Sequence, residues 1–98
     1  MNKTTTDDIF GDLGFHPAEA AILNRKSELM IELLKIVQTR RLSDAQAAKE
    51  FGVARQSIKQ LKNGALDDFQ IEQLIAMLAR VGTSVKFVLS EKKGIRAA

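Results

Sequence analysis

A chain of 98 residues, 45% of them hydrophobic and 28% charged, has enough apolar material for one folded domain and is not disordered by composition. It has no Cys, which excludes a disulfide framework, a thiolate metal site and a cysteine nucleophile. No apolar run approaches the roughly 18 residues that a membrane span needs. The net charge of +3 is uneven, because residues 1–24 carry one base and four acids whereas residues 25–98 carry fourteen bases and eight acids. A basic body suits a polyanionic partner. The absence of Cys fits a cytoplasmic location, and the polar residues 1–6 lack the basic-then-apolar order of a signal peptide.

Residues 1–16 are predicted to form an N-terminal arm, in which two glycines separate three apolar residues. Pro17 suits the first turn of a helix, because the N–H that it lacks would have no partner there. From Pro17 to Arg40 the chain has strong helix formers and neither Gly nor another Pro. We therefore expect one long helix after the arm.

Two apolar stripes run along this expected helix. The first has the i, i+3, i+4, i+7 spacing of a face turned to the core, and consists of Met30, Leu33, Leu34 and Val37. The second has a spacing of seven and consists of Ile22, Leu29 and Ile36. Together the two stripes form an apolar surface that is wider than one small core needs. The extra surface suits either the N-terminal arm or a partner, and we favour the arm.

Residues 17–82 are expected to form one helical domain, with three shorter helices after the long one. Ser43 can cap a helix that ends near Phe51, because its hydroxyl accepts from a free backbone N–H. Gly52 can then adopt the left-handed conformation that ends this helix without a Cβ penalty.

The next helix is predicted over residues 54–62, and Asn63-Gly64 ends it, since both residues tolerate a positive φ. Asp67 or Asp68 is predicted to cap the last helix, which ends at Gly82.

Residues 83–90 are predicted to form a C-terminal strand, with a tail over 91–98. Polar and apolar residues alternate from Ser84 to Leu89, with Val88 as the exception. A lone strand in a helical bundle exposes unpaired N–H and C=O groups. We therefore expect a second copy to pair with it in a twofold homodimer. The predicted fold class is mainly α, a bundle of four to five helices with a C-terminal β-strand.

Residues 42–64 have the spacing of a helix-turn-helix. Ala48 is small enough for two helices to cross closely, and Gly52 supplies the turn. Three apolar residues fill the corner between the helices, namely Val53, Ile58 and Leu61. The outer face of the second helix is then free to enter a major groove, which is about 12 Å wide.

These residues have the sequence L-S-D-A-Q-A-A-K-E-F-G-V-A-R-Q-S-I-K-Q-L-K-N-G, which resembles, without a gap, the lambda-repressor and Cro-like (XRE) family. The residues that stand where the family pattern expects them are Ser43, Ala48, Gly52, Val53, Ile58, Leu61, Asn63 and Gly64. A looser resemblance, carried by F-G-D-L-G-F and F-Q-I-E-Q-L-I-A-M-L, is to the HigA-type antitoxins. The first resemblance implies a lambda-repressor-like fold that binds double-stranded DNA, and the second implies a toxin protein as a further partner.

Two residues depart from the family pattern. Asp44 stands at a helix start where the family usually has a Gln that touches a phosphate, and a carboxylate there suits the helix dipole but repels phosphate. Gln46 is a doubtful substitute. Ala54 is a poor N-cap where Ser or Thr is usual. Both favour weak or altered DNA binding.

The second helix of the motif carries the candidate DNA-binding residues. Arg55, Gln56 and Lys59 lie away from its apolar side; Arg can bond both acceptors of guanine, and Gln can pair with adenine. Ser57 can assist from the same edge. Two further residues are better placed for backbone phosphates, namely Lys62 and Asn63.

Other polar residues are expected to be solvated. His16 is the single His of the chain, so it has no companions for a catalytic triad or a metal cluster. Asp7-Asp8 could be mistaken for a catalytic pair of carboxylates, but the sequence indicates no pocket or partner for it. Arg25-Lys26 and Arg40-Arg41 flank the long helix and could reach phosphates, but solvated charge is the simpler interpretation. We expect no catalytic, cofactor-binding or metal-binding residue, and no enzyme.

The sequence therefore predicts a DNA-binding repressor that occupies a palindromic operator as a dimer. The looser resemblance adds an antitoxin role, in which the acidic arm with its apolar residues Phe10, Leu13 and Phe15 binds a basic toxin. A different class of function remains open. Asp44 and Ala54 also fit a protein-interaction module whose degenerate helix-turn-helix does not bind DNA specifically.

Overall fold

The computed structural model describes residues 8–89, and within them the chain is an all-helical bundle. Five α-helices and one 3-10 turn follow one another in the order α2 (Ile9–Asp12), α3 (Pro17–Thr39), α4 (Asp44–Phe51), α5 (Arg55–Lys62), η1 (Leu66–Asp68) and α6 (Ile71–Arg80). The predicted helical bundle is confirmed.

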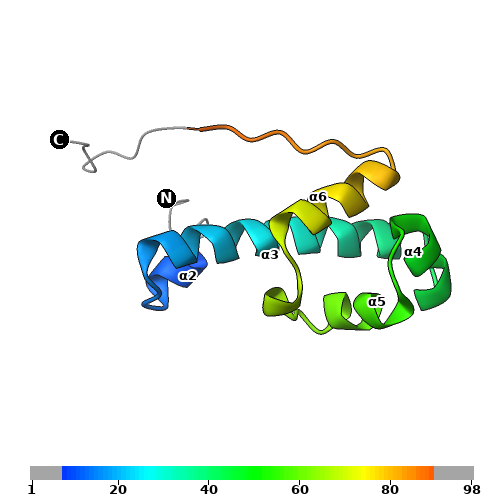
Figure 1. Cartoon of the computed structure of the whole chain (residues 1–98), viewed down its shortest axis with the longest axis horizontal. Helices are drawn as coiled ribbons and strands as arrows, with labels where there is room; N and C mark the ends of the chain where they lie inside the picture. The colour runs from blue at the N-terminus through cyan, green and yellow to red at the C-terminus, as the bar shows by residue number, and fades with distance from the viewer. Residues whose placement is uncertain (1–7, 90–98) are drawn as a thin grey trace.

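The long helix α3 is the spine of the molecule (Figure 1). The short α2 packs on its N-terminal end, whereas α5, η1 and α6 contact it farther along, and α4 packs on α5 and α6. Pro17 occupies the first turn, and the ring Nδ1 of His16 accepts from the Ala18 N–H at 3.2 Å. At the other end Arg41 adopts a left-handed φ of 53°, which lets the Leu42 N–H reach the Val37 carbonyl at 3.0 Å. The chain thus turns sharply from α3 into α4.

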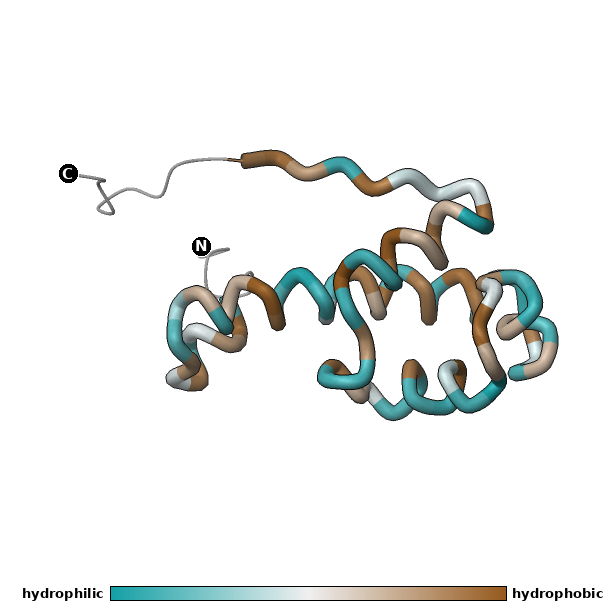
Figure 2. Tube along the Cα trace, in the orientation of Figure 1, coloured by the Kyte–Doolittle hydropathy of each residue, from teal (hydrophilic) through white to brown (hydrophobic). Residues whose placement is uncertain are grey.

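One apolar core joins α3 to the three helices that follow it. The expected first stripe of α3 faces this core, with Leu33 fully buried, and meets Phe51, Ile58 and Leu74 from the other helices. In Figure 2 the hydrophobic stretches of these helices face one another. Val85, beyond α6, also packs against the core and is half-buried. The core therefore lies under α4, α5 and α6.

The end of the expected arm is a helical turn that is tied to α3 by Asn24. This side chain is 7% exposed; its Oδ1 accepts from the Phe10 N–H at 3.1 Å, and its Nδ2 donates to Asp8 Oδ1 at 2.8 Å. The same Asp8 oxygen accepts from the Gly11 N–H at 3.1 Å and so caps α2. α2 thus covers part of the long helix, although Ile22 stays 49% exposed.

Two sequence predictions are wrong in the described residues. No strand forms over residues 83–89, and position 90 lies outside the described range with the tail 91–98. The physical reason is that a strand needs the edge of another strand, and the described helices offer none. Asp67 and Asp68 belong to η1, so neither caps α6. That helix begins after Gln70, whose side chain makes no capping hydrogen bond.

Candidate nucleic-acid interface

The first helix of the motif, α4, is closed at both ends as expected. Ser43 Oγ accepts from the Gln46 N–H at 3.1 Å, and Gln46 Oε1 accepts from the Ser43 N–H at 2.9 Å, which is a complete capping box. Gly52 ends the helix with φ +73°, and the next N–H, of Val53, donates to the Ala48 carbonyl at 2.9 Å. Gln46 is therefore engaged with its own helix.

The second helix, α5, is held by its buried side. Ile58 and Leu61 are fully buried in the core, and the small Ala48 of α4 is 7% exposed where these elements meet. Ala54 precedes the helix with extended backbone and gives no side-chain hydrogen bond to it, so the first turn of α5 keeps free N–H groups. Packing thus fixes the orientation of α5 and leaves its polar side outward.

Most of the candidate DNA-binding residues lie on the outward side of α5. Arg55, Gln56 and Lys59 are exposed, and within residues 8–89 their side chains make no hydrogen bond to the protein. Ser57 is half-buried, and Asn63 at the C-cap is exposed. The helix itself contains no acidic residue, so this side is basic and polar along its whole length.

Lys62 differs from the other bases of α5, because Asp44 of α4 binds it. The Lys62 Nζ donates to Asp44 Oδ1, forming an ion pair between side chains that are 44% and 27% exposed. This hydrogen bond, and then the positive charges of Lys62, Lys59 and Arg55, hold the pKa of Asp44 below its ordinary value of 3.8 against a smaller opposing effect of desolvation. The Asp44 carboxylate therefore lies within the field of the whole basic side of α5.

Two arginines outside the motif, Arg40 and Arg80, make polar contacts with α4. Arg40 at the end of α3 lies 3.9 Å from Glu50 and donates to the Val81 carbonyl at 3.4 Å. Arg80 of α6 donates to the Glu50 carbonyl at 3.4 Å and lies over Gly52. These contacts join the C-terminal ends of α3, α4 and α6. Arg40 is thus not simply solvated, and no local sequence signal indicated its role.

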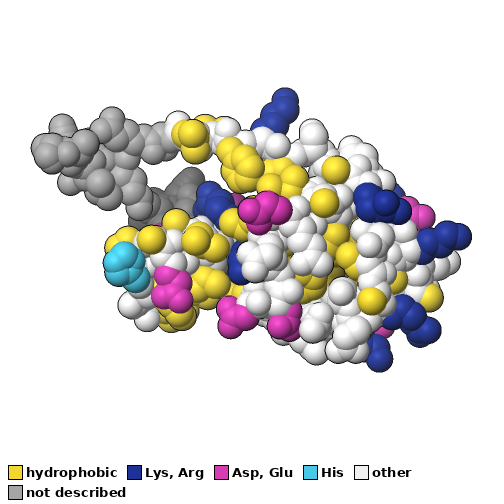
Figure 3. Space-filling model, in the orientation of Figure 1, with side chains coloured by type: hydrophobic (Ala, Val, Ile, Leu, Met, Phe, Trp, Pro, Cys, Tyr) yellow, Lys and Arg dark blue, Asp and Glu magenta, His cyan; other side chains and the backbone are white. Residues whose placement is uncertain are grey.

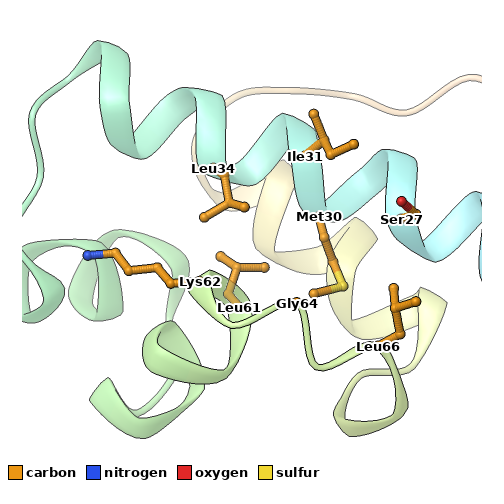
Figure 4. Close-up of a pocket in the computed structure, with 8 residues that line it drawn as sticks. All are labelled: Ser27, Met30, Ile31, Leu34, Leu61, Lys62, Gly64 and Leu66. Carbon is orange, nitrogen blue, oxygen red and sulfur yellow. The ribbon is translucent and has the colours of Figure 1, made fainter.

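An apolar pocket of about 170 Å³ lies between α3 and the end of α5 (Figure 4). Met30, Leu34 and Leu61 point toward one another across it, whereas Lys62 extends away. Its lining is mostly apolar and holds no acid and no His. In residues 8–89 no group of His, Cys, Asp or Glu is arranged to hold a metal ion, and no helix is long and apolar enough to cross a membrane.

Comparison with known proteins agrees with this geometry. A family model described as a helix-turn-helix domain matches residues 9–90. A solved structure of a protein described as an XRE-family transcriptional regulator superposes with a TM-score of 0.70 at 30% identity, over 82% of this chain and 90% of that chain. No curated protein matches the chain.

The fold and the outward α5 define a DNA-binding domain of the helix-turn-helix class. The chain belongs to the helix-turn-helix domain family matched by the model, and it resembles XRE-family transcriptional regulators, which are typically not enzymes.

Proposed function

We propose that this protein is a transcriptional repressor that reads operator DNA with α5 in the major groove. The observation that carries the proposal is the outward polar side of α5, whose bases Arg55 and Lys59 have no protein partner within residues 8–89. An α-helix fits the major groove, and the anchored Ile58 and Leu61 keep this one from rotating away. A repressor of this kind acts in the cytoplasm, on the DNA there.

The candidate residues divide into two roles. Arg55 bonds a guanine edge through its two-pronged guanidinium, and Gln56 pairs with adenine. Lys59, with Ser57 beside it, contacts bases or the adjoining backbone. Phosphate contacts fix the register without reading sequence, and Asn63 at the exposed end of α5 suits that role, as does Lys62 once it is released from Asp44.

A homodimer would present two copies of α5 to a palindromic operator, about 34 Å apart along the DNA. The exposed apolar residues after α6 support this proposal, since Phe87 is 56% exposed and both Val88 and Leu89 are 91% exposed. A second copy that packs against this segment would cover these side chains.

The test of sequence reading is a selection of bound duplexes from a random DNA pool, followed by titration of the selected site and its single-base variants. Arg55→Ala should lose about 1–3 kcal/mol of discrimination at one base pair. Lys49→Ala removes a positive charge from the exposed side of α4 and is the matched control. Equal losses on the selected site and on random DNA would remove Arg55 from the reading residues.

The test of the dimer is sedimentation of a charged variant. Phe87→Asp should convert a micromolar dimer into a monomer with unchanged helical content, because a carboxylate cannot be buried between two copies without a partner. Lys86→Asp, on the neighbouring exposed position, is the control and should leave the dimer intact. A wild-type chain that sediments as a monomer would exclude this assembly.

An antitoxin role is the second candidate, and a hollow between α2 and η1 favours it. This acidic hollow has a volume of about 520 Å³. It is lined by apolar and acidic side chains with no base among them: Phe10, Phe15, Glu19, Leu23, Leu66, Asp67 and Asp68. The two Phe rings meet edge to face with centroids 5.6 Å apart. Aromatic faces beside carboxylates suit the Lys and Arg side chains of a small basic toxin.

The antitoxin proposal is tested with the product of the neighbouring reading frame. That product should be a short basic protein that co-purifies with this chain, and Asp67→Lys with Asp68→Lys should release it without affecting DNA binding. A protein-interaction module with a degenerate helix-turn-helix is the remaining alternative. It predicts no salt-dependent retardation of DNA, whereas the repressor predicts strong retardation at low salt.

A further inference from the structure

The contact between Asp44 and Lys62 joins the two helices of the motif at the side that is turned to solvent. Asp44 is the first residue of α4, and Lys62 is the last residue of α5. Both side chains are partly exposed, so neither is fixed by burial. Asp44 therefore competes with any other anion for the ammonium group of Lys62.

We propose that Asp44 limits the affinity of this protein for DNA by occupying Lys62, the base at the end of the reading helix. The proposal rests on the DNA-binding function proposed above and names the residue that sets its strength. A DNA phosphate is the anion that would replace the carboxylate at Lys62. To gain that contact the complex must break the ion pair and leave an acid beside the phosphate backbone.

The surroundings of Asp44 support this competition. Lys59 and Arg55 also place positive charge near the carboxylate, so Asp44 weakens the electrostatic attraction of all three bases of α5. The other ion pairs between residues 8 and 89 involve no base of α5. Removal of this one negative charge thus frees one base completely and unshields two more.

The size of the effect follows from counterion release. Each phosphate neutralised by a protein base steepens the fall of log affinity with log salt by about 0.9. One freed lysine per protomer therefore increases affinity about fivefold at about 0.15 M salt, and about threefold more when the salt is lowered to about 0.05 M.

The experiment is fluorescence anisotropy with a labelled random-sequence duplex of about 20 base pairs, because phosphate contacts need no operator. Asp44→Asn should bind about fivefold more tightly per protomer at about 0.15 M salt, with a salt slope steeper by about 0.9. The matched control is Asp67→Asn, which removes the same charge from an exposed carboxylate that has no ion pair within residues 8–89. It should change the slope little. Helical content by circular dichroism verifies that each variant is folded.

The double variant identifies Lys62 as the freed base. Asp44→Asn combined with Lys62→Ala should return the salt slope to that of the wild type, since a neutral pair replaces a neutral pair. If the double variant keeps the whole gain, or if Asp67→Asn gives the same gain, the proposal is overturned. If the wild type and Asp44→Asn both fail to bind the duplex at about 0.05 M salt, the proposed function itself is wrong. A wild type that binds with an unaltered Asp44→Asn slope refutes only the inference.

Discussion

Replacement of Asn24 by Ala tests how α2 is held on α3. The Asn24 side chain is 7% exposed and makes two hydrogen bonds, to the Phe10 N–H at 3.1 Å and to Asp8 Oδ1 at 2.8 Å. Alanine removes both, and it leaves the Phe10 N–H without its partner. No local motif replaces this connection, because Asn24 and Phe10 are fourteen residues apart in the chain.

Asn24→Ala should lower the global free energy of unfolding and the free energy with which α2 docks on α3, by different amounts. Two hydrogen bonds of a buried amide contribute about 1–3 kcal/mol together. α2, however, contains no buried residue, so it can detach and expose its free groups to water. The global free energy of unfolding should therefore fall by about 1 kcal/mol or less, whereas the docking of α2 alone loses about 1–2 kcal/mol. A loss of that size raises the population of the locally opened state about 5- to 30-fold.

Amide hydrogen exchange by NMR separates the loss of α2 docking from the loss of global stability. The N–H groups of Asp12 and Leu13, which donate to the carbonyls of Asp8 and Ile9, should exchange about 5- to 30-fold faster in Asn24→Ala. The amides of α5 should be unaffected. Asn63→Ala, at an exposed Asn, is the control. Unchanged exchange at Asp12 and Leu13 would refute the assigned role of Asn24.

Three further predictions concern backbone and charge. Gly52→Ala should destabilise the fold by about 1–2 kcal/mol in urea unfolding, because φ is +73° and a Cβ there would meet Arg80. Arg41→Gly should raise the free energy of unfolding by about 0.5–1 kcal/mol and so raise the urea midpoint, because Gly adopts the left-handed φ of 53° without a Cβ clash. An unchanged midpoint would contradict that conformation. Lys62→Ala should raise the carboxyl pKa of Asp44 in an NMR titration. Because that pKa is lowered in the fold, the stabilisation from the pair is present above the unfolded pKa near 3.8 and is lost as pH falls through the folded pKa.

Local signals in the sequence predicted most of the helices. Pro17 and the stripe through Leu33 gave the long helix to within one residue of its observed end at Thr39. Ser43 and Gly52 define the ends of α4 because capping and left-handed turns depend on residues only a few positions apart. The outward position of Arg55 on α5 followed from the buried spacing of Ile58 and Leu61 in the same way.

The features that escaped prediction depend on residues far apart in the chain. The contact of Asp44 with Lys62 spans eighteen positions, and that of Asn24 with Asp8 spans sixteen. Neither has a spacing signature, because tertiary packing brings the partners together. The predicted strand does not form over residues 83–89 for a related reason. Alternation is a property of one segment, whereas a strand requires a second one.

Among residues 8–89 the lengthwise arrangement of the helices separates charge and so creates an electric dipole. Around α2 and the start of α3 the described acids Asp8, Asp12 and Glu19 face no Lys or Arg of their own segment, whereas α5 at the other end is basic. On the face in Figure 3 most Lys and Arg side chains lie over the end that holds α4 to α6. Such a dipole turns the protein as it approaches a polyanion, so that α5 leads and α2 trails. Productive collisions then become more frequent than random orientation allows, and the association rate constant falls steeply as salt is added.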